Sequence, residues 1–236
     1  MMNKHWVRTA VAAAMLAGSG AAMAEFSGNV TVVSDYLFDG VSQTDNKPAV
    51  QVGLDFALES GLYFGFWGSN VDFPDYGDTG IETDWYVGYG WGDEAVAFDV
   101  GAVLYKYVGL DDDIDGEDVD YDYNEIWFGV TFNENSTIKW WYADDLANSG
   151  ESAWRLKFSH SFAINDAWSI PIELTHTSAE DALGDDFNHI KVGVATSFDP
   201  VNVELSLQMT DADEDDYDED IYSTDGNIVL AIGFDF

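Results

Sequence analysis

The last ten residues, "NIVLAIGFDF" at positions 227–236, alternate apolar side chains with small or polar ones, Val229 excepted. Successive side chains of a β-strand point to opposite faces. One face of this segment therefore carries Ile228, Leu230, Ile232, Phe234 and Phe236. The chain ends on an aromatic residue although its formal net charge is -37. A soluble acidic protein would need a core to bury such a face.

The same period of two runs through most of the chain. In residues 50–58, for example, Val50, Val52, Leu54 and Phe56 share one face. Such alternation indicates β-strands with one apolar side, and we expect about 12 of them. They are predicted at residues 26–38, 50–58, 62–73, 81–91, 96–104, 126–132, 138–142, 154–162, 168–174, 190–198, 201–209 and 228–236.

The connections between the predicted strands alternate in length. The short ones are "ESG", "GDE", "NEN", "IND" and "DP", and the long ones are "DGVSQTDNK", "PDYGDTG", "GLDDDIDGEDVD", "DDLANSGE", "TSAEDALGDD" and "DADEDDYDEDIYSTDG". This asymmetry is typical of outer-membrane barrels. The sequence therefore predicts an all-β fold, an antiparallel transmembrane β-barrel with short periplasmic turns and long acidic extracellular loops. A soluble barrel or β-sandwich also alternates, with its apolar face inward, and strand parity alone does not separate the two.

Aromatic residues and one proline add to this prediction. Trp and Tyr near strand ends favour the membrane barrel, because they form girdles at membrane interfaces. The predicted girdle residues are Tyr36, Trp91, Tyr105, Trp127, Trp141, Tyr142, Trp154 and Trp168. Pro171 lies inside the predicted strand 168–174 and cannot donate to its ladder. We therefore expect that strand to begin near Pro171 or to contain a bulge there.

The N-terminus has the three parts of a secretory signal peptide. A start with Lys4 and Arg8 precedes a short apolar run, and "AMA" at 22–24 provides an A-x-A cleavage site. We predict that residues 1–24 are removed, which leaves residues 25–236 as one outer-membrane β-barrel. A membrane anchor is the alternative, but the apolar run is shorter than the roughly 20 residues that a spanning helix needs. The chain has no cysteine, which excludes disulfides, thiol catalysis and cysteine metal sites.

A family resemblance rests on the stretch "SDYLFDGVSQTDNKPAVQVGLDFALESGLYFGFWGSNVDF" at residues 34–73. The residues that carry it are Ser34, Asp35, Tyr36, Gly40, Val41, Ser42, Gln43, Thr44, Pro48, Ala49, Val50, Gly61, Tyr63, Gly65, Trp67, Gly68, Ser69, Asn70 and Val71. They resemble the N-terminal signature of the TorF-type porins, the Gcw_chp family of exported bacterial proteins. The resemblance implies an outer-membrane porin without catalytic residues. Asp39 stands where the family commonly has a basic residue, so the charge preference of this member would differ if residue 39 lines the mouth.

The terminal strand carries a second resemblance. Outer-membrane barrels typically end in an alternating strand with a terminal aromatic residue, which the barrel-assembly machinery recognises. By this resemblance, the assembly signal comprises Leu230, Ile232, Phe234 and Phe236. The expected partners are this machinery and outer-membrane lipid in a Gram-negative bacterium, and the strand would close the barrel by pairing with residues 26–38.

If the apolar face meets lipid, the residues at the alternate strand positions, which have the opposite parity, line the lumen. The lumen-lining candidates are Asp55, Glu82, Asp84, Asp99, Glu125, Lys139, Arg155, Lys157, Glu173, Lys191 and Glu204. Most acidic candidates precede the basic ones along the chain, so an acidic wall would face a basic wall. Rings of charge select ions by sign. Alternatively, these groups pair with one another and close the barrel, because a lumen of about 12 strands lies between filled small barrels and open porins.

One acidic loop, "DDDIDGEDVDYD" at residues 111–122, has the spacing of a calcium-binding loop. The ligand positions would be occupied by Asp111, Asp113, Asp115 and Asp122, and the turn position by Gly116. The last ligand is Asp instead of Glu and no helices flank the loop, which favours a solvated acidic loop with weak Ca²⁺ association. No other cofactor is expected.

These observations together predict a function. The net charge excludes nucleic acid as a partner and suits cations. His160, His176 and His189 form no catalytic spacing with Ser or Asp, so we expect no enzyme. We expect an outer-membrane porin for passive diffusion of small solutes or ions, with a preference for cations, as a monomer or a trimer. The alternative is a non-conducting structural or adhesive barrel with a charged, plugged lumen and Ca²⁺-associating acidic loops.

Overall fold

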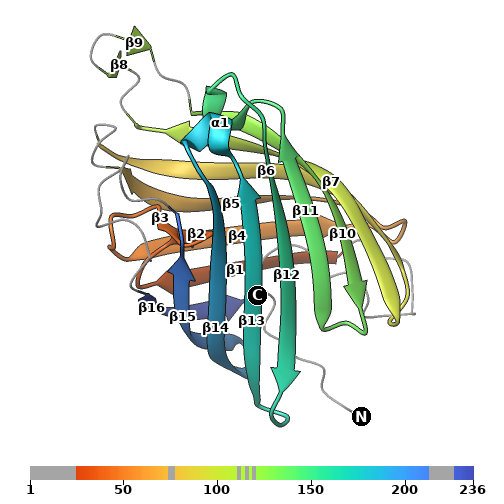
Figure 1. Ribbon diagram of the computed structural model, residues 1–236. Coiled ribbons are helices and arrows are strands. Elements are labelled where there is room, and N and C mark those ends of the chain that lie inside the picture. Colours follow the sequence, from red (N-terminus) through yellow and green to blue (C-terminus); the bar gives the residue numbers. More distant parts are fainter. Residues whose placement is uncertain (1–24, 74–77, 111–112, 115–116, 119–120, 213–225) are drawn as a thin grey trace.

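Twelve antiparallel strands close into one barrel in the computed structural model, which describes residues 25–73, 78–110, 113–114, 117–118, 121–212 and 226–236 (Figure 1). The barrel strands are β1 (Glu25–Val33), β4 (Ala49–Ala57), β5 (Leu62–Phe73), β6 (Asp78–Gly92), β7 (Val96–Val108), β10 (Tyr123–Phe132), β11 (Ser136–Ala143), β12 (Ala153–Ala163), β13 (Trp168–Ser178), β14 (Asp186–Phe198), β15 (Val201–Thr210) and β16 (Asn227–Asp235). Each strand pairs with the next one along the chain, and β1 pairs with β16. The predicted antiparallel barrel is therefore confirmed.

The connections contain only short elements among the described residues. These are the hairpin of β2 (Leu37–Phe38) and β3 (Val41–Ser42), the hairpin of β8 (Asp113–Ile114) and β9 (Glu117–Asp118), the 3₁₀ turn η2 (Leu146–Asn148) and the helix α1 (Glu180–Leu183). Neither helix is long or apolar enough to cross a membrane.

The strands are strongly staggered. If the paired residues are followed from strand to strand once round the barrel, the path comes back to β1 about 16 residues away from its starting residue. This stagger corresponds to a strand tilt of about 45° relative to the barrel axis. The strands therefore tilt as strongly as those of outer-membrane barrels.

The outer face of the barrel is apolar and the inner face is polar. On the outer face, Ile228 of β16 is 71% exposed and Phe26 of β1 is 62% exposed. Charged side chains of the opposite parity, such as Glu125 and Lys191, are buried inside. A soluble barrel would place its apolar face inside, so this arrangement excludes that alternative.

The barrel has two unlike ends. Tight connections at residues 58–61, 93–95, 133–135, 164–167 and 199–200 define the short-turn end, where β1 begins and β16 ends. The other connections define the long-loop end, and Figure 1 shows α1 and the β8–β9 hairpin together there. The β5–β6 connection is shorter than predicted, because β6 begins at Asp78, before the predicted strand start at residue 81.

Part of the predicted aromatic girdle is wrong. Tyr105 and Trp127 are 5% exposed and point into the barrel, and Trp141 packs with them there. Tyr36 lies in the connection after β1, with its ring 5.3 Å from that of Trp67. Tyr105, Trp127 and Trp141 therefore point inward, and Tyr36 lies outside the strand. The prediction had considered only how near these residues are to strand ends.

Other predicted girdle residues face outward. Trp91, Trp154 and Trp168 are exposed on the outer face. Tyr142 stacks on the outward-facing Trp140, with ring centroids 5.9 Å apart.

Pro171 lies within β13, which begins three residues earlier, at Trp168. The register between β13 and β14 is the same on both sides of Pro171, so the predicted bulge is absent. Gly193 lies opposite, and a Cβ there would be only 3.2 Å from Cγ of the proline. The sheet therefore accommodates the missing donor by leaving a gap in the ladder beside a residue without a side chain.

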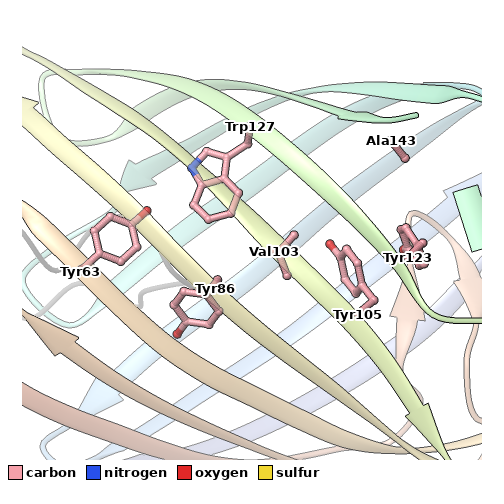
Figure 2. Packing of buried hydrophobic residues seen from close by; sticks show 7 residues of the cluster. All are labelled: Tyr63, Tyr86, Val103, Tyr105, Tyr123, Trp127 and Ala143. Atoms are coloured by element: carbon pink, nitrogen blue, oxygen red, sulfur yellow. The ribbon is translucent and has the colours of Figure 1, made fainter. Parts of the chain in front are cut away.

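Three aromatic rings lie flat against the inner wall over glycines of adjacent strands. A Cβ on Gly88 would meet the Tyr63 ring at 2.3 Å, and a Cβ on Gly101 would meet the Trp127 ring at 2.2 Å. A Cβ on Gly65 would likewise meet the Tyr86 hydroxyl at 2.4 Å. Figure 2 shows these three rings along the wall. Because the inward glycines have no side chain, they leave room for the rings to lie against the wall.

We expect Gly101→Ala to lower the free energy of unfolding by about 2–3 kcal/mol, because the methyl group would overlap the Trp127 ring and lie 2.5 Å from the Val87 carbonyl oxygen. Urea unfolding of the refolded barrel in detergent measures the change. Gly129→Ala is the matched control, since the atoms nearest to its Cβ would lie at ordinary contact distances, Lys139 Cγ at 3.6 Å and the Asp99 Cβ at 3.7 Å. Equal losses in the two variants would contradict the close packing of Trp127.

Candidate functional site: the charged lumen

The inner wall near the short-turn end carries small polar side chains. They are half-buried and comprise Ser27, Thr131, Thr137, Ser159, Ser161, Ser197 and Asn202. The hydroxyls of Thr131 and Thr137 are 2.9 Å apart across two strands. Short side chains fill less of the lumen at this end than a wall of long ones would.

The segment between β1 and β4 folds into the lumen from the long-loop end. Its hairpin of β2 and β3 is called the inner hairpin below. Asp39 at its tip is 4% exposed. A Cβ on the next residue, Gly40, would lie 2.6 Å from Thr210 Cβ and 3.0 Å from the His189 ring, so the tip lies directly against β14 and β15.

The root of the inner hairpin is fixed by hydrogen bonds between residues of the sequence signature. The Asp35 carboxylate accepts from the hydroxyl of Ser42 at 2.7 Å, and the Thr44 hydroxyl lies 3.2 Å from it. The Tyr36 N–H donates to Oγ1 of Thr44 at 3.1 Å, and this hydroxyl donates to the Lys47 carbonyl at 2.7 Å. The signature thus builds a hairpin that enters the barrel.

The tip of the inner hairpin is bound to two cations on β12. The carboxylate of Asp39 lies 3.1 Å from Lys157 Nζ and 3.4 Å from the Arg155 guanidinium. The guanidinium also lies 4.4 Å from the ring centroids of both Phe38 and Trp141. Burial alone would raise the pKa of Asp39, but Lys157 and Arg155 hold it well below its usual range.

Every basic side chain that faces inward among the described residues contacts a carboxylate. Arg155 lies 2.7 Å from Glu125, and Lys139 lies 3.4 Å from Asp99. A chain of further pairs joins Lys157 to Glu173 at 3.7 Å, Glu173 to Lys191 at 3.4 Å and Lys191 to Glu204 at 2.8 Å. The positive charges on β11 to β14 are therefore largely neutralised.

The carboxylates on β4 to β7 have mainly aromatic donors instead. Asp99 accepts from the Tyr63 hydroxyl and the Trp127 Nε1–H, both at 2.6 Å. Asp55 accepts from the Tyr86 hydroxyl at 2.6 Å. The rings that lie flat on the wall therefore also orient acidic groups.

The structure places all eleven lumen-lining candidates on the inner face. The basic ones lie on β11, β12 and β14, and Asp55, Glu82, Asp84, Asp99 and Glu125 lie on β4, β6, β7 and β10. Glu173 and Glu204 lie among the basic residues, where they pair with Lys191. The two walls are therefore less separate than the sequence suggested.

Sequence reasoning missed several inward groups. His189 is buried in the lumen, with Nε2 3.2 Å from Oε1 of Gln208. Tyr63 and Tyr86 were also missed as lumen-lining residues. His189 shares its parity with Lys191, which would have identified it. The position of Asp39 inside the barrel has no such signal, because it follows from the path of a loop.

The acidic-loop prediction is only partly within the described residues. Asp111 and Asp115 lie outside them, and Asp113 belongs to β8. Asp122 pairs with Lys106 and accepts the Tyr107 N–H at 3.0 Å. Among the described side chains, no three of His, Cys, Asp and Glu come together as metal ligands.

The predicted assembly signal lies on the outer face of β16 and at Phe236, which directly follows this strand. Leu230, Ile232, Phe234 and Phe236 are exposed. Phe236 exchanges two backbone hydrogen bonds of 2.9 Å with Gly28 of β1. The residues of the predicted signal peptide, 1–24, lie outside the described residues.

The closed barrel, apolar outside and charged within, has the fold of outer-membrane porins and channels. The chain belongs to the family described as "Bacterial protein of unknown function (Gcw_chp)", whose model matches residues 17–233. None of the curated proteins matches it.

Two solved structures illustrate the shared fold. A KdgM porin in complex with disordered oligogalacturonate has 8% sequence identity and a TM-score of 0.55, over 89% of this chain and 98% of that one. An outer membrane channel from Pseudomonas putida F1 has 12% identity and a TM-score of 0.54, over 96% and 99% of the two chains.

Proposed function

We propose that the protein is an outer-membrane porin of the TorF type that lets small solutes and ions diffuse passively, with a preference for cations. The exposed apolar outer face suits a lipid environment. Export would use the cleaved residues 1–24, and assembly would use the terminal strand that ends at Phe236. The protein would act without catalytic residues.

One observation carries the cation preference. Each inward Lys and Arg among the described residues is paired with a carboxylate, and the seven carboxylates among the lumen-lining candidates together with Asp39 outnumber these four cations two to one. The uncompensated charge of the lumen is therefore negative. A negative lumen concentrates cations and repels anions.

Planar-bilayer recordings test this function. In a KCl gradient, we expect single-channel currents whose reversal potential lies toward the K⁺ equilibrium potential, because the lumen carries excess negative charge. The preference should weaken at high salt, since the salt screens the carboxylates. A reversal potential on the chloride side would contradict the cation preference.

A sealed barrel is the second candidate, and the burial of the ion pairs favours it. The side chains of Arg155 and Glu125 are only 8% and 6% exposed. Folded barrel that inserts into the bilayer without any conductance would support this candidate against the porin. Heat-modifiable migration in gels verifies that the inserted material is folded.

A further inference from the structure

Two acidic side chains, Glu82 and Asp84, lie two residues apart on the inner face of β6, in its half nearer the long-loop end. Glu82 is 2% exposed. Its Oε1 accepts from the Tyr107 hydroxyl at 3.4 Å, and the Tyr36 hydroxyl lies near this carboxylate and interacts with it electrostatically. Its other oxygen, Oε2, and Oδ1 of Asp84 are buried and accept no hydrogen bond from any described residue.

No basic side chain in the described part of the chain neutralises this pair by contact. Arg155, whose charge acts on both carboxylates, is bound to Asp39 and to Glu125. The two carboxylates also repel each other. Because an uncompensated buried carboxylate is strongly unfavourable, the pair requires either protons or a bound cation.

The oxygen atoms around the pair suit a hard cation. Carboxylate and hydroxyl oxygens are the ligands that Ca²⁺ prefers, and a charge of 2+ would balance both carboxylates. The Tyr36 and Tyr107 hydroxyls are already directed at Glu82. The buried Ser69 is the cross-strand neighbour of Glu82 and brings another hydroxyl.

We propose that Glu82 and Asp84, with the hydroxyls of Tyr36 and Tyr107, bind a divalent cation of the Ca²⁺ type inside the lumen. The inner hairpin takes part, because Tyr36 belongs to its root. The site deepens the proposed channel function and rests on it for any role in permeation. Binding itself is independent of conduction, so the two proposals fail separately.

Terbium luminescence tests the site in the refolded full-length barrel. Tb³⁺ replaces Ca²⁺ and emits when nearby Tyr or Trp rings are excited, and Tyr36 and Tyr107 adjoin the site. We expect sensitised emission that Ca²⁺ displaces in the wild type. The double variant Glu82→Gln/Asp84→Asn should lose it, with at least a tenfold weaker affinity. The matched control Glu59→Gln/Asp166→Asn removes the same charge from exposed short turns and should keep it.

Thermal unfolding gives a second readout. A ligand that binds only the folded state stabilises it. Ca²⁺ should therefore raise the melting temperature of the wild type and of the control, but not of the double variant. In EDTA the double variant should melt higher than the wild type, because the repulsion is gone.

The outcomes separate the two proposals. Equal Ca²⁺-displaceable emission in the double variant and the wild type, or none in the wild type, would overturn the cation site and leave the porin proposal standing. Site-specific binding by a barrel without conductance would support the cation site and overturn the porin.

Discussion

Asp39→Asn is expected to shift the reversal potential in a KCl gradient toward the chloride value and to lower the preference for K⁺. The substitution removes the carboxylate that lies 3.1 Å from Lys157 and 3.4 Å from Arg155, so these cations would attract anions. A unit charge a few ångströms from the ion path is worth about 1 kcal/mol or more, which corresponds to roughly a fivefold change in the permeability ratio. Planar-bilayer recordings of both proteins measure it.

Asp45→Asn is the matched control for this experiment. Asp45 belongs to the same connection but pairs with the exposed Lys47, at 2.7 Å, so its removal should leave the selectivity nearly unchanged. An unchanged reversal potential in Asp39→Asn would mean that the tip of the inner hairpin does not line the ion path.

The pH dependence of the Asp39 contact follows from its depressed pKa. For an acid of this kind, the stabilisation is complete above the unfolded pKa, about 3.9, and is lost as the pH falls through the lower folded value. Acidification to about pH 4 should therefore leave the inner hairpin docked.

Arg155→Met is expected to be the most destabilising single substitution proposed here. It would leave the Glu125 carboxylate, whose side chain is 6% exposed, without its cation, whereas Asp39 would keep Lys157 at 3.1 Å. Removing one partner of a buried ion pair costs about 3–5 kcal/mol, because the remaining charge stays buried and unpaired. Denaturant unfolding of the refolded barrel in detergent measures the loss.

Lys106→Met is the control, because Lys106 also pairs with a carboxylate, that of Asp122, but at an exposed position. Its loss should stay within about 1 kcal/mol. Adding Glu125→Gln to Arg155→Met should recover part of the stability, since the unpaired charge of Glu125 disappears. A loss below about 1 kcal/mol in Arg155→Met would show that water reaches the Glu125 carboxylate.

The fold could be predicted from the sequence because the evidence for it is local. Alternation along each strand and the lengths of the connections identified the barrel, its strand count and the inner face. The same parity placed Arg155 and Glu204 inside. The alternation along a strand assigns each side chain to the inner or the outer face, and a side chain on the inner face meets the lumen.

The rest of the site depends on contacts between distant parts of the chain. Trp127 was assigned to a girdle because its place near a strand end was given more weight than its parity. The ion pairs of Lys157 with Asp39 and Glu173 depend on register and on the path of a loop. No sequence periodicity indicates these ion pairs, because each results from packing between separate parts of the chain.

The inner hairpin also has a consequence for the order of assembly. Asp39 and Arg155 are 116 positions apart, so the contact that fixes the hairpin tip joins an early part of the chain to a late one. Contacts of such long range form late, because a long loop must close first. A nascent barrel would thus remain unobstructed until β12 has joined, and its permeability would be restricted only near the end of folding.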